Sequence, residues 1–103
     1  MYRHNFMINV ATDFALSASG RTVQDGMYSA EVFFEMMRKK VKVYGKVIVC
    51  FDDVLTVGSS FLHEIAKLTI AHNLVDKVIV ICDNDKYIKE KYNKYIKEIQ
   101  NDQ

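Results

Sequence analysis

The chain has 103 residues, of which 50% are hydrophobic and 26% charged, and its formal net charge is +1. This is the composition of a single ordinary globular domain, and the small net charge excludes a general attraction to nucleic acid or to an anionic membrane. No apolar run approaches the roughly 20 residues that span a bilayer, and the opening MYRHNFMINV lacks the long apolar core of a signal peptide. We therefore expect a cytoplasmic protein with no membrane segment.

Two short strands are predicted at the start of the chain, Asn5–Val10 and about Phe14–Ala18. The polar stretch Ser19–Tyr28 is expected to form an ordered loop. Ser29 then offers a hydroxyl that can cap a helix, and Gly45 ends that helix. Its apolar positions at helical spacing are Phe33, Met36, Met37 and Val41. Together with Phe34 they make a wide arc, which is either a partner surface or a helix buried on two sides.

The second half of the chain alternates buried strands with helices. Lys46–Phe51 and Lys77–Cys82 are nearly continuous β-branched runs, typical of strands covered on both faces. Between them, Ser59 or Ser60 is expected to cap a helix that carries Leu62, Ile65, Ala66 and Thr69 on one side. A turn at Asp83–Asp85 caps a last helix. Its apolar stripe is formed by Ile88, Tyr92, Tyr95, Ile96 and Ile99.

The element order is therefore β-β-α-β-α-β-α, in one domain over residues 1–103. Strand–helix–strand connections favour parallel pairing with right-handed crossovers. We expect an α/β fold with a mixed sheet of about four strands and helices packed mainly on one face. The only cysteines, Cys50 and Cys82, end the two buried strands and lack CxxC spacing. They are expected to be buried thiols in a reducing compartment, and a bridge between them stays open.

The segment Val47–Leu68 resembles the central strand, turn and helix of STAS domains, the family of anti-sigma-factor antagonists. In that family an Asp-Ser-Ser-Gly type of motif opens the helix, and the matching residues here are Gly58-Ser59-Ser60-Phe61. A group of bacterial STAS-like domains is closer still. That group has an Arg and a Gly ahead of its first helix, as in Gly20-Arg21-Thr22, and a helix start similar to Ser29-Ala30-Glu31-Val32-Phe33.

The resemblance implies a STAS-like fold and a regulatory protein-binding domain with no enzymatic activity and no cofactor. Family antagonists bind a histidine-kinase-like ATPase, which phosphorylates the serine at the helix start. By this match Ser59, with Ser60 beside it, is the candidate phosphoacceptor, although Gly58 stands where the family has Asp. The implied partner surface is formed by Arg21, Asp52, Asp53, Gly58, Ser59, Ser60 and His63. A homodimer is a further expectation left open.

The same residues have other interpretations. Ser59 and Ser60 could serve only as helix caps, and Arg21 could fix its loop through the backbone or Asp25 as well as pair with a carboxylate or phosphate. Catalysis is not expected, because the residues around Ser59 are not a G-x-S-x-G elbow and His63 is expected to point outward. No metal site is expected, because His4, His63 and His72 are widely spaced.

Two alternative functions remain. One is a small phage or mobile-element effector that blocks a host protein by binding it. The other is a nucleic-acid-contacting module that uses the last helix, Asp85–Gln103. Lysines and tyrosines alternate there from Lys86 to Lys97. The acidic residues of that helix dilute its charge, so a solvated lysine face over a packed apolar stripe is the interpretation we favour, and nucleic-acid binding is not expected.

Overall fold

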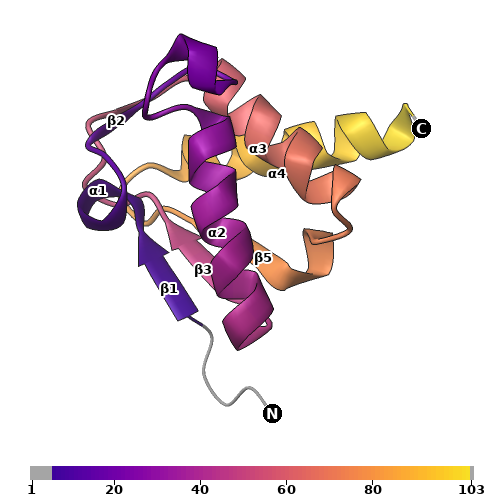
Figure 1. Ribbon diagram of the computed structural model, residues 1–103. Coiled ribbons are helices and arrows are strands. Elements are labelled where there is room, and N and C mark those ends of the chain that lie inside the picture. Colours follow the sequence, from indigo (N-terminus) through magenta and orange to yellow (C-terminus); the bar gives the residue numbers. More distant parts are fainter. Residues whose placement is uncertain (1–5, 103) are drawn as a thin grey trace.

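The computed structural model describes residues 6–102, which form an α/β domain (Figure 1). Its main sheet has three strands in the order β1-β3-β5: β1 is Phe6–Asn9, β3 is Val47–Cys50 and β5 is Val78–Ile81. All pairs are parallel, and Ile48 of β3 lies between Met7 and Ile79 of its neighbours. The α/β class and the three apolar strands are thus confirmed. Asn5 of the predicted first strand, His4 and Gln103 lie outside the described residues.

Three long helices connect or follow these strands. They are α2 (Ala30–Tyr44), α3 (Ser59–Ala71) and α4 (Lys86–Asn101). Helices α2 and α3 lie on the same face of the sheet, because their buried residues join one core cluster with Ile8, Val49 and Val80, which share one face of the strands. Helix α4 packs along α3 on that side and contacts β5 (Figure 1). Packing of the helices on one face is as expected.

The predicted second strand is largely absent, so the sheet differs from the mixed four-stranded one expected. After β1 the chain forms the short helix α1 (Val10–Asp13), and only β2 (Ser17–Ala18) is extended. The Asp13 carboxylate accepts the backbone N–H of Asn9 at 2.8 Å, which favours this turn. Strand β2 pairs in parallel with β4 (Thr56–Val57), and this ladder is separate from the main sheet.

Most helix boundaries follow the local chemistry read from the sequence. The Ser29 hydroxyl accepts the N–H of Val32 at 3.4 Å and caps α2. Gly45 ends α2 with φ of 86°, a left-handed conformation that favours glycine. Asp85 caps α4 by accepting the N–H of Tyr87 at 3.1 Å. Two short 3₁₀ helices, η1 (Val23–Asp25) and η2 (Val75–Lys77), lie in the loops.

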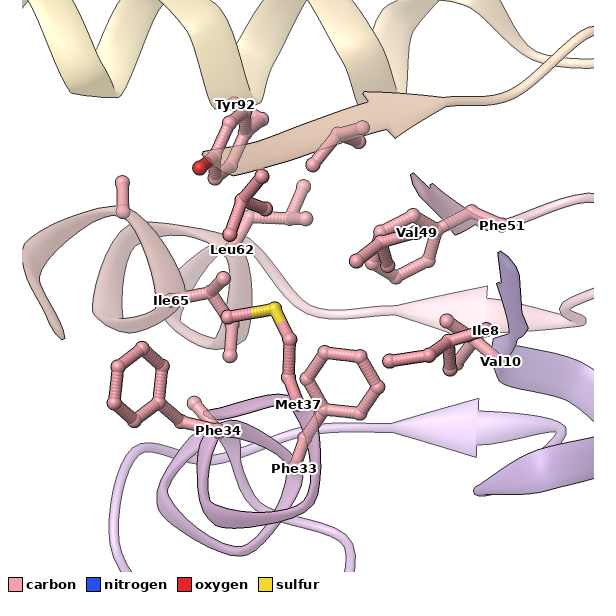
Figure 2. Packing of buried hydrophobic residues seen from close by; sticks show 14 of the residues in the cluster. Ile8, Val10, Phe33, Phe34, Met37, Val49, Phe51, Leu62, Ile65 and Tyr92 are labelled. Carbon is pink, nitrogen blue, oxygen red and sulfur yellow. The ribbon is translucent and has the colours of Figure 1, made fainter. Parts of the chain in front are cut away.

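The core lies between the sheet and the three long helices (Figure 2). Phe33, Phe34 and Met37 of α2 are all buried, and Met36 is partly buried against the same cluster. The wide apolar arc of α2 is therefore mostly internal. The apolar stripe of α4 also faces the core, with Tyr92 buried and Tyr95 half-buried.

The two cysteines are buried and unpaired, as predicted for thiols that fill space. Burial raises the pKa of both thiols, which makes them poor nucleophiles. Cys82 belongs to the core cluster, whereas Cys50 projects from the opposite face of the sheet. Among residues 6–102, none of the helices combines the length and the apolar character needed to cross a membrane.

Candidate functional site

The candidate residues gather at the carboxyl edge of the sheet and along α3. Because β3 and β5 are parallel, the turns that follow them meet at the same edge. The turn after β3 contains Asp52 and Asp53 and leads through β4 to α3. The turn after β5 contains Asp83 and leads to α4. The first turns of α3 and α4 are thereby brought together, and this is the region in which open α/β sheets usually bind ligands.

Asp52 links the two turns. Its Oδ1 atom accepts the backbone N–H of Asp83 at 2.8 Å and that of Asn84 at 3.1 Å. Its Oδ2 atom accepts the Cys50 thiol proton at a heavy-atom distance of 3.4 Å. The hydrogen bond from Asn84, with those from Cys50 and Asp83, holds the pKa of Asp52 below its usual range. Asp52 is thus engaged within the domain, while the neighbouring Asp53 is exposed with φ of 68°.

Ser59 lies at the start of α3, but the prediction that Ser59 or Ser60 caps this helix is wrong. Gly58 is the N-cap residue, and no side chain caps the helix. The reason is the β2–β4 ladder: the Gly58 N–H donates to the Ala18 carbonyl at 3.0 Å, and its own carbonyl accepts from Leu62. The helix therefore begins one or two residues earlier than the sequence indicated.

The exposed Ser59 hydroxyl instead bonds to the neighbouring helix. Lys91 of α4 donates from Nζ to Ser59 Oγ at 2.9 Å. Ser60, the next residue, is half-buried. Gly58 has an ordinary extended conformation, and a Cβ built there would meet no atom closer than 3.7 Å. The backbone therefore does not require glycine, and a Cβ has room at this position.

Arg21 and His63 form a second cluster beside α3. The Arg21 guanidinium donates to Glu64 Oε1 at 3.2 Å and lies 3.0 Å from His63 Nδ1. Since a guanidinium can only donate, Nδ1 is the acceptor in this contact. The His63 ring also meets the Tyr95 ring edge-on, at 5.0 Å between centroids. His63 is therefore held by its neighbours and is half-buried, where the sequence indicated an outward orientation.

Both interpretations of Arg21 are partly realised. Its side chain pairs with a carboxylate, that of Glu64. Its loop is fixed separately, because Asp25 Oδ2 accepts the Arg21 backbone N–H at 3.0 Å. The backbone N–H groups of Thr22 and Arg21 both donate to the Asp25 carboxylate, and these hydrogen bonds lower the pKa of Asp25. Two carbonyls of the loop also accept hydrogen bonds from α2: Gly20 accepts from the N–H of Ala30 and Arg21 from that of Glu31, each at 3.0 Å.

A cavity of about 200 Å³ lies beside Lys91, between the turn after β3 and the first turns of α3 and α4. Its walls include Leu55 and Val57 from the turn, Leu62 of α3, and Tyr87, Ile88 and Lys91 of α4. The volume is below the roughly 300–1,000 Å³ typical of small-molecule sites. Among residues 6–102, no group of three or more His, Cys, Asp or Glu side chains is arranged to hold a metal ion.

The structure thus brings His63 to Arg21, and it leaves Asp52 in a separate hydrogen-bonded turn. Three contributors were missed from the sequence: Lys91, Glu64 and Tyr95. Lys91 directly precedes Tyr92 of the apolar stripe of α4, and this position is the sequence feature that could have placed it beside the rest of the domain. Glu64 gave no such signal, because 43 residues separate it from Arg21.

No protein-family model, curated protein or solved structure matches the chain.

Proposed function

We propose that this chain is a non-enzymatic, regulatory protein-binding domain whose contact surface is centred on Ser59 at the start of α3. The observation that carries the proposal is an exposed serine hydroxyl at a helix N-terminus, 2.9 Å from the ammonium group of Lys91. Arg21, held by Glu64, lies along the same helix, and Asp53 lies in the preceding turn. The resulting surface presents both charge signs and is suited to a charged protein partner.

The arrangement around Ser59 favours binding over catalysis. A serine nucleophile needs a neighbouring base with a free electron pair. Lys91 is exposed and donates a hydrogen bond to the hydroxyl oxygen. His63 directs Nδ1 toward Arg21. These contacts give Ser59 a donor where catalysis would need an acceptor.

The same contacts suit Ser59 as a phosphoacceptor. A phosphate adds about −1.5 to −2 charges and three acceptor oxygens. At this position it would meet Lys91 and the first backbone N–H groups of α3, both of which favour an anion. Phosphorylation would therefore replace a neutral contact by a charged one and change the surface that a partner meets. By the resemblance noted above, the partner we propose is a histidine-kinase-like ATPase in a bacterial cytoplasm.

The test is an affinity purification from the native cell with the full chain as bait, followed by mass spectrometry of bait and partners. We expect the ATPase in the eluate, phosphate on Ser59, and at least tenfold less partner with the Ser59→Glu bait. Gln100→Glu is the matched control, because it adds the same charge at the exposed far end of α4. Equal capture by Ser59→Glu would contradict the proposal.

The alternatives give different results in the same experiment. An effector that blocks a host protein would form a stable complex with an unmodified bait. A nucleic-acid module would retain DNA or RNA in a salt-dependent manner and lose it when Lys89, Lys91 and Lys94 are changed. In α4, Tyr92 and Tyr95 pack against the domain and Tyr87 is exposed. Two of the three aromatic rings are therefore not displayed for base stacking, which is why we favour the protein partner.

A further inference from the structure

The face of the main sheet that points away from the helices is apolar. Side chains alternate along a strand, and Ile8, Val49 and Val80 belong to the core cluster on the helix side. The alternate positions belong to the other face. They form two rows across the three strands, Met7–Ile48–Ile79 and Asn9–Cys50–Ile81.

This face carries no charged side chain within the strands. Its Met7–Ile48–Ile79 row is incompletely covered by the described residues, whereas Cys50 of the other row is buried. Met7 and Ile79 are each 42% exposed, and Ile48 is only half-buried although it lies on the central strand. None of these three belongs to the core cluster or packs against it. Parallel sheets occur almost only with both faces covered, and their strands are apolar on both sides for that reason. The strands are thus apolar on both faces of the sheet, whereas the helices cover only one of these faces.

Charges of opposite sign border the two ends of this face. Lys46 and Lys77 directly precede β3 and β5 at the amino edge, with Asp76 offsetting one of them. At the carboxyl edge, Asp52 and Asp53 follow β3 and Asp83 follows β5. Lys46, Lys77, Asp53 and Asp83 are exposed, and within residues 6–102 none forms a salt bridge. The face is therefore apolar in the middle, positive at one end and negative at the other.

We infer that this face binds a second copy of the chain in an antiparallel, two-fold symmetric dimer. A two-fold axis across the strands places each strand over its own counterpart in the opposite direction. Lys77 of one copy then lies over Asp83 of the other, and Lys46 over Asp53. A two-fold axis along the strands would instead oppose like charges at both edges. Charge complementarity thus selects both the occupant and its orientation.

The size of the face sets the strength of the dimer. Three strands about 4.8 Å apart and four residues long, at about 3.3 Å per residue, cover about 14 Å by 13 Å. A standard interface buries about 800 Å² per partner. The strand face alone is much smaller, so the charged rims must contribute and the dimer dissociates on dilution. Ser59 of α3 and Lys91 of α4 lie on the helix side and stay accessible, and Asp53 is the one residue that both surfaces use. The inference therefore does not rest on the proposed function.

Sedimentation of the full chain over a concentration series tests the dimer. The same measurement is made on variants that reverse a charge at one edge of the face. We expect the wild type to dimerise, and Lys77→Glu and Asp83→Lys each to weaken dimerisation by at least about tenfold, since each change occurs twice across the axis. Mixing the two variants restores the dimer, because each then supplies the charge that the other lacks. Lys97→Glu, on the exposed face of α4, is the control and should dimerise like the wild type.

Each alternative result is informative. A wild type that stays monomeric at every concentration overturns the inference. If both single variants dimerise as the wild type does, the interface lies elsewhere. If the mixture stays monomeric while each variant is folded by circular dichroism, the antiparallel arrangement is wrong. Ile79→Glu, in the middle of the face, should abolish the dimer, and a dimer that persists in this folded variant also contradicts the inference.

Discussion

At the scale of single residues, Asp52 shows how a polar side chain in a turn can have a structural role that resembles a binding role. It was a candidate for partner contact because it follows a buried strand near the start of α3. Its carboxylate is instead occupied by the backbone of the turn after β5, through Asp83 and Asn84. Hydrogen bonds from backbone N–H groups to a carboxylate stabilise its charged form.

This role predicts a pH dependence of stability. The folded-state pKa of Asp52 is lowered from its ordinary value of 3.8. The contribution of ionised Asp52 to the free energy of unfolding is therefore fully present above the unfolded-state pKa. It is lost as the pH falls through the folded-state pKa. Asn keeps a carbonyl acceptor but has no charge to lose, so Asp52→Asn should lose less unfolding free energy between pH 7 and pH ~3 than the wild type.

Urea titrations across that pH range measure the effect. Asp53→Asn is the matched control, because the adjacent carboxylate is exposed and Asn tolerates the left-handed backbone at this position. It should keep the acid dependence of the wild type. An acid dependence of Asp52→Asn identical to that of the wild type would show that Asp52 does not link the turns.

At the scale of elements, α3 is the central helix of the domain. It packs between α2 and α4, and its first turn carries Ser59 while its next turn meets Arg21. Phe61, Leu62, Ile65, Ala66 and Thr69 of this helix are all buried. The Thr69 hydroxyl donates to the Ile65 carbonyl at 2.7 Å, so even its buried polar group is satisfied. The position of the candidate site therefore depends on the packing of α3.

Ile65→Ala tests that dependence. Ile65 is 2% exposed, and its truncation leaves a cavity between helices, so we expect a loss of roughly 2–5 kcal/mol of unfolding free energy. Lys67→Ala, on the exposed side of the same helix, should change it by less than about 0.5 kcal/mol. Chemical denaturation of both variants makes the comparison. A loss as small as that of Lys67→Ala would show that this face of α3 does not pack as described.

At the scale of the whole molecule, one core joins the three strands and the three long helices. Its members come from every one of these elements, from Ile8 of β1 to Ile96 of α4. No second core separates one part of the described chain from another. A chain of this size with one contiguous core unfolds cooperatively.

We therefore expect a single unfolding transition at protein concentrations where the chain is monomeric. Circular dichroism in the far ultraviolet follows the helices, and tyrosine signals in the near ultraviolet follow tertiary packing around residues such as Tyr92. The two midpoints should coincide. Separate midpoints would mean that some elements unfold independently of this core.

The sequence by itself determined the parts of this protein that depend on local chemistry. Ser29, Gly45 and Asp85 act on residues only a few positions away, and the apolar runs at Val47–Cys50 and Val78–Ile81 mark strands wherever they pair. The α/β class and the one-sided helices follow from these elements through the general handedness of crossovers. Ser59 was predicted correctly to lie at a helix start, although the residue that caps this helix was not.

Only the tertiary structure decided what lies beside Ser59 and what happens to the predicted second strand. Lys91 is 32 residues from Ser59, and Glu64 is 43 residues from Arg21. Such contacts depend on how α3 and α4 pack. The segment after β1 alternates like a strand, but the hydrogen bond from Asn9 to Asp13 favours a turn. Its remaining extended residues pair with β4, which in turn makes Gly58 the N-cap of α3. Pairing between distant segments is decided by the energy of the whole fold, and no local pattern contains it.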